Sequence, residues 1–221
     1  MKNLVKDFVP FYLISSTQLI IDYCKSIKLR RITKPLLIPV LSYVYHYICF
    51  SKKIQENKTY YIIYFFHWMG DIFLLFGDWS DLYKVGIVSF FIGDSLLAKE
   101  FYKMIPNFQL MEYLCIYVFY FPIVLFILFV WYIKYSKIKT IIAAFIYDFP
   151  LTSMLALSTY LFIKTSKDID FILMFGCISF FISDHMIIHE LIVPTMYRRH
   201  FWVMLTYLIA EGLICYSNLC H

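Results

Sequence analysis

Two aspartates stand inside stretches of the sequence that are otherwise apolar. Asp71 lies in FFHWMGDIFLLF (65–76) and Asp184 lies in CISFFISDHMII (177–188), each directly after a small residue. An isolated charge in such surroundings is costly, so each carboxyl must be paired, hydrogen-bonded or protonated. Two such acids suit general acid–base chemistry, because burial and mutual repulsion favour the protonated form of one while the other stays ionised.

The composition indicates that these runs lie in a membrane. Of 221 residues, 62% are hydrophobic and 16% are charged, against about a quarter charged in average proteins. Helices are the simple way to satisfy backbone polar groups in lipid. The net charge of +5 lies mostly between apolar runs without basic–aromatic interleaving. We therefore expect membrane lipids, and no nucleic acid, as partners.

Apolar runs separated by short charged connectors predict an all-α membrane protein, with residues 1–221 forming a single bundle of about eight transmembrane helices. The first run continues through Gln18 and Asp22 without a small-residue cleavage site, so we interpret it as a retained span and not a signal peptide. The six cysteines form no CxxC pair, which makes a disulfide framework or zinc knuckle unexpected. The predicted spans are 9–24, 36–50, 60–77, 82–98, 110–133, 140–163, 170–189 and 201–217.

The direction of each predicted span places several polar residues near one end of the bundle. We call the end that holds the N-terminus end A and the opposite end, end B. Asp71 and Asp184 come six and five residues before the ends of spans that run from A to B, roughly 8–9 Å inside end B. Tyr147 and Asp148 lie roughly 10–12 Å below the same end on the same arithmetic.

Cations mark the membrane interface at end B. Lys34, Arg198 and Arg199 all lie there, and such side chains either bind phosphate or anchor helix ends against headgroups. Asp94 is expected nearer end A and Glu211 near the middle, so neither is expected to join the acids at end B. Lys and Arg are split almost evenly between the two ends, so the positive-inside rule does not fix the orientation.

The histidines allow a second interpretation as a metal site. Ser42 and His46 form SxxxH, and His185 and His189 form HxxxH, the spacing that puts two imidazoles on one helix face. With Asp71 this loosely resembles the membrane metal hydrolases related to alkaline ceramidase. His189 lies at the predicted membrane edge, and the surroundings do not otherwise match. We expect neither a metal nor an organic cofactor.

Taken together, the segments resemble the lysoplasmalogenase family of membrane proteins, the YhhN family. GDIFLLF is similar to the family's GD-x-x-L element, FFISDHMII to its F-x-x-SD element, and YDFPLTSMLA carries the matching Tyr and Met. The resemblance extends over almost the whole chain in order. The supporting segments are VPFY, KPLLIPVL, GIVSFFIGD and VPTMYRRHFWVMLTYLIAEGLI.

The resemblance implies an eight-helix hydrolase that cleaves the vinyl-ether bond of lysoplasmalogens, giving a fatty aldehyde and glycerophosphoethanolamine or glycerophosphocholine. The family's two important aspartates correspond to Asp71 and Asp184. The expected substrate is a lysophospholipid, and its expected binding residues are Lys34, Tyr147, Ser183 and Arg198. If the protein is eukaryotic, we expect it in the endoplasmic reticulum or another endomembrane.

The chain also departs from the family's pattern. The family usually has His at the position of Asp94, Tyr at that of Leu97 and Gln at that of Glu211. These changes leave open a non-catalytic alternative, a lipid-binding or transport-like bundle that keeps the fold. The metal-dependent lipid hydrolase is the other alternative.

Overall fold

The computed structural model describes residues 4–76, 81–135, 138–192 and 197–221, and this part of the chain is helical and contains no strand. The all-α prediction is therefore confirmed. In chain order the elements are α1 (Leu4–Asp7), α2 (Val9–Tyr23), α3 (Ile27–Thr33), the 3₁₀ turn η1 (Lys34–Leu36), α4 (Leu37–Lys52), α5 (Lys58–Phe73), the 3₁₀ turn η2 (Leu74–Phe76), α6 (Asp81–Met104), α7 (Leu110–Tyr135), α8 (Ile138–Thr165), α9 (Asp168–Ile192) and α10 (Arg199–Cys220).

Each predicted span corresponds to a helix, although the predicted 60–77 ends at Gly77, outside the described residues. Within the described ranges, five helical segments are long and apolar enough to cross a membrane. They are Lys58–Phe76, Leu110–Ile127, Ile141–Thr165, Asp168–His189 and Arg199–Cys220.

The other three predicted spans form shorter or more polar helices. Helices α2 and α4 have 15 and 16 residues, so they are roughly 23–24 Å long, short of the roughly 30 Å hydrocarbon core. Helix α6 has 24 residues but carries Asp94, Lys99 and Glu100. The count of eight spans is therefore not confirmed, and the single domain over 1–221 stays a prediction.

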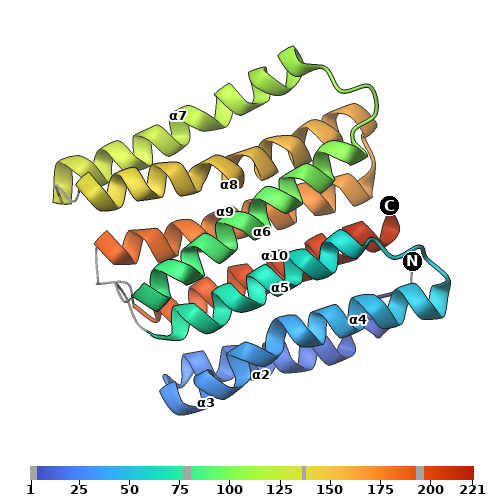
Figure 1. Ribbon diagram of the computed structural model, residues 1–221, viewed down its shortest axis with the longest axis horizontal. Helices are drawn as coiled ribbons and strands as arrows, with labels where there is room; N and C mark the ends of the chain where they lie inside the picture. Colours follow the sequence, from blue (N-terminus) through green and yellow to red (C-terminus); the bar gives the residue numbers. More distant parts are fainter. Residues whose placement is uncertain (1–3, 77–80, 136–137, 193–196) are drawn as a thin grey trace.

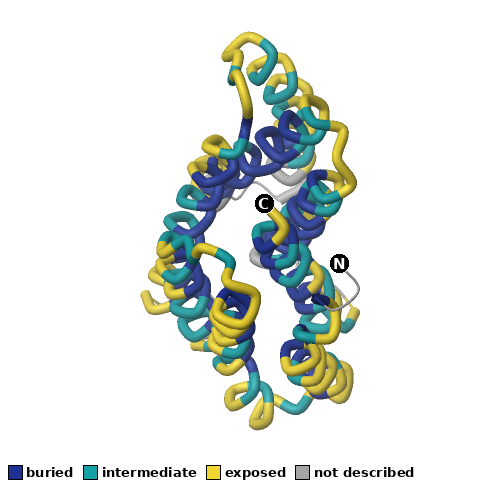
Figure 2. The backbone as a smooth tube through the Cα atoms, turned by 90° about the vertical axis from the view of Figure 1, so that its right-hand side faces the viewer, coloured by how far each residue is buried: buried dark blue, intermediate teal, exposed yellow. Residues whose placement is uncertain are grey.

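The helices form two facing layers that run between the same two ends (Figures 1 and 2). Helices α4, α5 and α6 form one layer, and α2, α10 and α9 form the other, with neighbours in each layer packed together. Helix α8 packs on both α6 and α9 and closes one edge, with α7 outside it, while α2 and α4 meet at the other edge. Both termini lie at end A (Figure 1).

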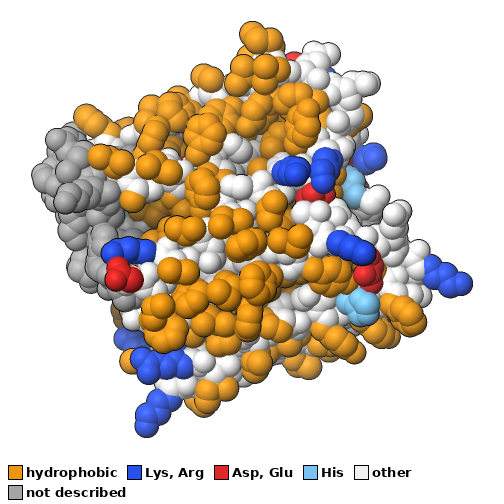
Figure 3. All heavy atoms as spheres, in the orientation of Figure 1, with side chains coloured by type: hydrophobic (Ala, Val, Ile, Leu, Met, Phe, Trp, Pro, Cys, Tyr) orange, Lys and Arg blue, Asp and Glu red, His pale blue; other side chains and the backbone are white. Residues whose placement is uncertain are grey.

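The outer surface is the kind that lipid can cover. Large apolar side chains such as Phe50, Phe119 and Phe126 are exposed. Figure 3 shows apolar side chains over most of the visible face, with charged side chains gathered towards its two ends. In contrast, acids, phenols and histidines are buried, and some contact each other across the two layers, such as Asp71 of α5 with Tyr207 of α10. The polar residues therefore face the interior of the bundle, which is where functional polar groups of membrane proteins lie.

Candidate active site

Asp71, in the last turn of α5, is bound by one cation and one phenol. The Nζ atom of Lys34 lies 3.2 Å from its Oδ1, and the hydroxyl of Tyr207 on α10 donates to its Oδ2 at 3.0 Å. All three side chains are buried. Burial lowers the pKa of the Lys34 ammonium, and the Asp71 carboxylate opposes that shift. Each charge depends on the other, because a buried charge that loses its partner is strongly destabilising.

Asp184, on α9, is bound differently. Its carboxylate accepts a hydrogen bond from the hydroxyl of Tyr147 on α8, and in the described part of the chain no ion pair with Lys or Arg reaches it. The preceding residue, Ser183, donates its hydroxyl to the backbone oxygen of Val203 at 3.1 Å. This bond ties α9 to α10 and uses the Ser183 proton, so its predicted role in substrate binding stays a prediction.

A third buried polar group lies one helical turn before Asp71. The Nδ1 atom of His67 lies 2.6 Å from Oε1 of Glu211 on α10, and its Nε2 lies 3.4 Å from Oδ1 of Asp94 on α6. From the sequence, neither acid is expected to join those at end B, yet the structure brings both to one imidazole. Both residues depart from the family's pattern, and this departure is the sequence feature that could have indicated their contact with His67.

The imidazole of His67 fits into a space made by aromatic rings and a glycine. The rings of Phe90 and Phe180 each lie with centroids 5.5 Å from that of His67. A Cβ atom at Gly93 would lie 2.4 Å from Cδ2 of His67, closer than non-bonded carbon atoms approach. The absence of a side chain at Gly93 is therefore what allows α6 to lie against this ring.

Asp148 and His185 form a further buried contact between a carboxyl and an imidazole. The Nδ1 atom of His185 lies 2.9 Å from the backbone oxygen of Phe181, and a carbonyl only accepts, so Nδ1 carries a proton. The Nε2 atom lies 3.3 Å from Oδ1 of Asp148. A hydrogen bond at this contact would require one more proton, on the imidazole or on the carboxyl. These residues neighbour Tyr147 and Asp184 in sequence.

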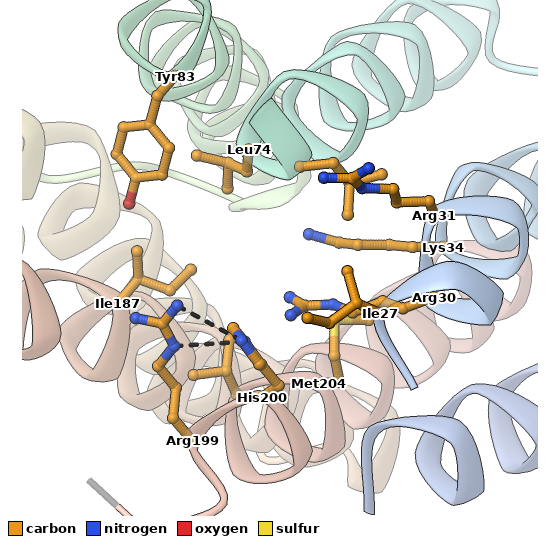
Figure 4. A pocket seen from close by; sticks show the side chains of 12 residues that line it. Ile27, Arg30, Arg31, Lys34, Leu74, Tyr83, Ile187, Arg199, His200 and Met204 are labelled. Carbon is orange, nitrogen blue, oxygen red and sulfur yellow. Dashed lines mark hydrogen bonds between the residues drawn. The ribbon is translucent and has the colours of Figure 1, made fainter. Parts of the chain in front are cut away.

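A cavity of about 230 Å³ opens at end B beside Lys34 (Figure 4). Since liquid water occupies about 30 Å³ per molecule, the cavity has room for a phosphate group with its first waters. The Lys34 ammonium points into it (Figure 4) while also reaching Asp71. The polar lining comes from Arg30, Arg31, Lys34, Arg199 and His200, beside apolar side chains such as Leu74 and Met204.

Of the two cations predicted to bind phosphate, Lys34 lines this cavity and Arg198 does not. The guanidinium of Arg198 lies over the ring of Tyr23, 3.5 Å from the centroid. It lines a neighbouring cavity of about 300 Å³, which shares Arg30 and Arg199 with the first. A phosphate role for Arg198 stays a prediction, and Arg199 lines both cavities.

The residues considered as metal ligands have separate partners. His46, towards end A, lies 2.8 Å from Glu56, while Asp71 contacts Lys34 and His185 contacts Asp148. Across the described ranges, no group of three or more His, Cys, Asp or Glu side chains is arranged to hold a metal ion.

Comparison with known protein families gives a match over most of the chain. The family model of the YhhN family matches residues 29–218. This range covers most of the chain and includes Lys34, Asp71, Asp184 and both phenols that bind the aspartates. No curated protein and no solved structure matches the chain.

Proposed function

The chain belongs to the YhhN family, the lysoplasmalogenase-like family, and from this membership we propose that it cleaves the vinyl-ether bond of alkenyl lysoglycerophospholipids. The products are a fatty aldehyde and glycerophosphoethanolamine or glycerophosphocholine. One observation carries the proposal: two buried aspartates are each hydrogen-bonded by a tyrosine, and Asp71 also contacts Lys34, which lines a cavity with other cations. In a eukaryotic cell we place this integral membrane protein in the endoplasmic reticulum or another endomembrane.

The chemistry of a vinyl ether matches two carboxyls in different states. A protonated carboxyl gives its proton to the outer alkene carbon, where a new C–H bond forms. The inner carbon and the ether oxygen then share a positive charge as an oxocarbenium ion. An ionised carboxyl stabilises that cation and takes a proton from the water that adds to it. The resulting hemiacetal breaks into aldehyde and alcohol, so the net reaction consumes one water. General acid catalysis of this kind contributes about 10²–10⁴-fold.

The cationic cavity supports a lysophospholipid as the substrate. A phosphate bound by Lys34 and the arginines around it would place the vinyl ether a few bonds deeper, near Asp71 and Asp184. In this arrangement Tyr147 and Tyr207 orient the two carboxyls through their hydrogen bonds. Ser183 and Arg198 keep their proposed substrate contacts at the margins of the site.

Replacement of each aspartate by its amide tests the proposal. Asp71→Asn and Asp184→Asn keep the shape of the side chain but cannot donate or accept the required proton, so each is expected to lower aldehyde release at least about 10²-fold. The assay uses purified protein in detergent and an alkenyl lysophosphatidylethanolamine. Glu100→Gln is the matched control, because Glu100 is a buried acid near end A that pairs with Lys103. Full activity in either aspartate variant would exclude the catalytic pair.

Carboxylic acid catalysis supplies every proton transfer in this scheme, so the proposal requires no metal and no organic cofactor. Turnover is expected to be unchanged by chelators, and elemental analysis to find no stoichiometric zinc. Zinc at one per chain that is lost in His185→Ala would instead support the metal-dependent hydrolase.

A non-catalytic lipid-binding protein is the second candidate, and one observation favours it. Two of the three departures from the family's pattern, Asp94 and Glu211, both contact His67. The departures therefore alter one group of contacting side chains, one helical turn from Asp71. A lysolipid that co-purifies with the protein and stays intact during long incubation would support this candidate. Steady release of aldehyde would exclude it.

A further inference from the structure

Lys34 both lines the cationic cavity and contacts the buried carboxyl of Asp71. Its ammonium group is the only charged partner that reaches Asp71 among the residues described, at 3.2 Å, and the same group points into the cavity (Figure 4). Around the cavity, Arg30 and Arg31 of α3 and Arg199 of α10 present further positive charge. An anion that enters this space would meet the same ammonium group that binds Asp71.

The two possible partners of Lys34 compete for its charge. A phosphate would be bound by the arginines as well, through their paired N–H donors, whereas among the described residues Asp71 has one neutral donor besides Lys34, the hydroxyl of Tyr207. Glu211, one helical turn after Tyr207 on α10, adds negative charge near Asp71. Asp22 and Arg30 are the other charged groups that act on Lys34. A buried carboxylate that loses its cation is strongly destabilised and becomes neutral by binding a proton.

We propose that a phosphate group bound in this cavity draws Lys34 away from Asp71, and that Asp71 then takes up one proton from the aqueous phase. The anion thereby converts Asp71 from a paired carboxylate into a proton donor. The catalytic consequence rests on the proposed function: Asp71 becomes the general acid when a headgroup is bound, and Asp184 is the carboxylate that stabilises the cation. Lys34 acts through Asp71 and is a positioning residue in this scheme.

Infrared difference spectroscopy tests the protonation step without any turnover. Purified full-length protein in a lipid film is perfused with buffer, then with inorganic phosphate, then with a lysophosphatidylethanolamine that carries a saturated alkyl ether in place of the vinyl ether. The C=O stretch of a protonated carboxyl is expected to appear on binding and to be absent from Asp71→Asn. A band with both ligands identifies phosphate as the trigger, and a band with the lysolipid alone identifies the lipid headgroup.

Variants at Lys34 distinguish this role from a structural one. Lys34→Met removes the charge, so the protonated-carboxyl band is expected before any anion is added and is expected not to change afterwards. Lys34→Arg restores a cation, so the band should again depend on the anion. Arg31→Gln is the matched control, because Arg31 lines the same cavity without contacting Asp71. It should weaken anion affinity by about 10- to 100-fold and leave the full band at saturation.

Two results would overturn the proposal. One is ligand binding, detected by calorimetry, with no new carboxyl band in the wild-type protein. The other is a band that survives in Asp71→Asn or that still requires the anion in Lys34→Met. Both readouts are independent of aldehyde release, so an inactive protein that shows the expected bands would contradict the proposed function and leave the protonation step intact.

Discussion

Asp71 and Asp184 show how the same side chain acquires two different environments. Asp71 has Lys34 at 3.2 Å and a phenol, and Asp184 has a phenol and, among the described residues, no Lys or Arg partner. The cation beside Asp71 favours its ionised carboxylate, and the hydrogen bond that Tyr147 donates favours the ionised carboxylate of Asp184. A bound phosphate is proposed to withdraw the cation from Asp71 alone, which leaves one protonated and one ionised carboxyl, as acid–base chemistry with two carboxyls requires.

Arg31 provides a test of phosphate binding at the scale of one residue. It lines the cavity and forms no ion pair with the acids that the structure describes. A phosphate contact that is equally strong in the ground and transition states affects KM and leaves kcat nearly unchanged. Arg31→Gln is therefore expected to raise KM about tenfold or more. Lys28→Gln is the control, because Lys28 is exposed on the same helix and lines neither cavity; equal KM values in both variants would contradict the assignment.

The ion pair between His67 and Glu211 links helices α5 and α10 across the two layers, at 2.6 Å. Removal of one partner from a buried pair costs about 3–5 kcal/mol, so Glu211→Gln should clearly lower the unfolding temperature in detergent. Glu112→Gln breaks a pair with Lys164 that is partly exposed, and exposed pairs contribute about 0–1 kcal/mol. An equal decrease of the unfolding temperature in the two variants would show that the interior pair contributes no more stability than the partly exposed one.

Helix packing provides a second test at the scale of the element. A Cβ atom at Gly93 would collide with His67 at 2.4 Å, whereas one at Gly212 would meet Phe11 at 3.2 Å. Overpacking of this kind costs about 1–3 kcal/mol. Gly93→Ala is therefore expected to destabilise the protein more than Gly212→Ala and to displace the imidazole, which a changed imidazole signal in NMR spectra would report. The reverse order of stability would contradict this packing.

The sequence predicted the helices more successfully than their contacts. Long apolar runs separated by charged connectors mark helices such as α9 and α10 to within a few residues, since hydropathy follows directly from residue types. The contact between α10 and α5 depends on how each helix is rotated about its own axis. When apolar residues lie on every side of a helix, the sequence does not indicate that rotation. Tyr207 and Glu211 stand four residues apart in TYLIAE and so share a helix face, and this was the unused signal for the contacts to Asp71 and His67.

At the scale of the whole molecule, two exposed cysteines report how the bundle crosses the membrane. Cys24 follows α2 at end B, and Cys220 ends α10 at end A. If the short helices α2 and α4 cross the bilayer together with the longer ones, these thiols face opposite sides. In single-cysteine variants in sealed vesicles, a membrane-impermeant maleimide added outside is expected to label one of them and to reach the other after permeabilisation. Labelling of both from outside would show that α2 does not cross.

Both cation-lined cavities lie at end B, and this has a consequence for the membrane around the protein. A site that opens at one end can draw substrate from one leaflet only. Under the proposed function, the protein in a sealed vesicle would exhaust the lysolipid of that leaflet, and turnover would then slow to the rate of transbilayer flipping. A cell that uses the protein to remove lysolipid would thus depend on scramblases to resupply that leaflet. The asymmetry of the bilayer would set how much substrate the protein encounters.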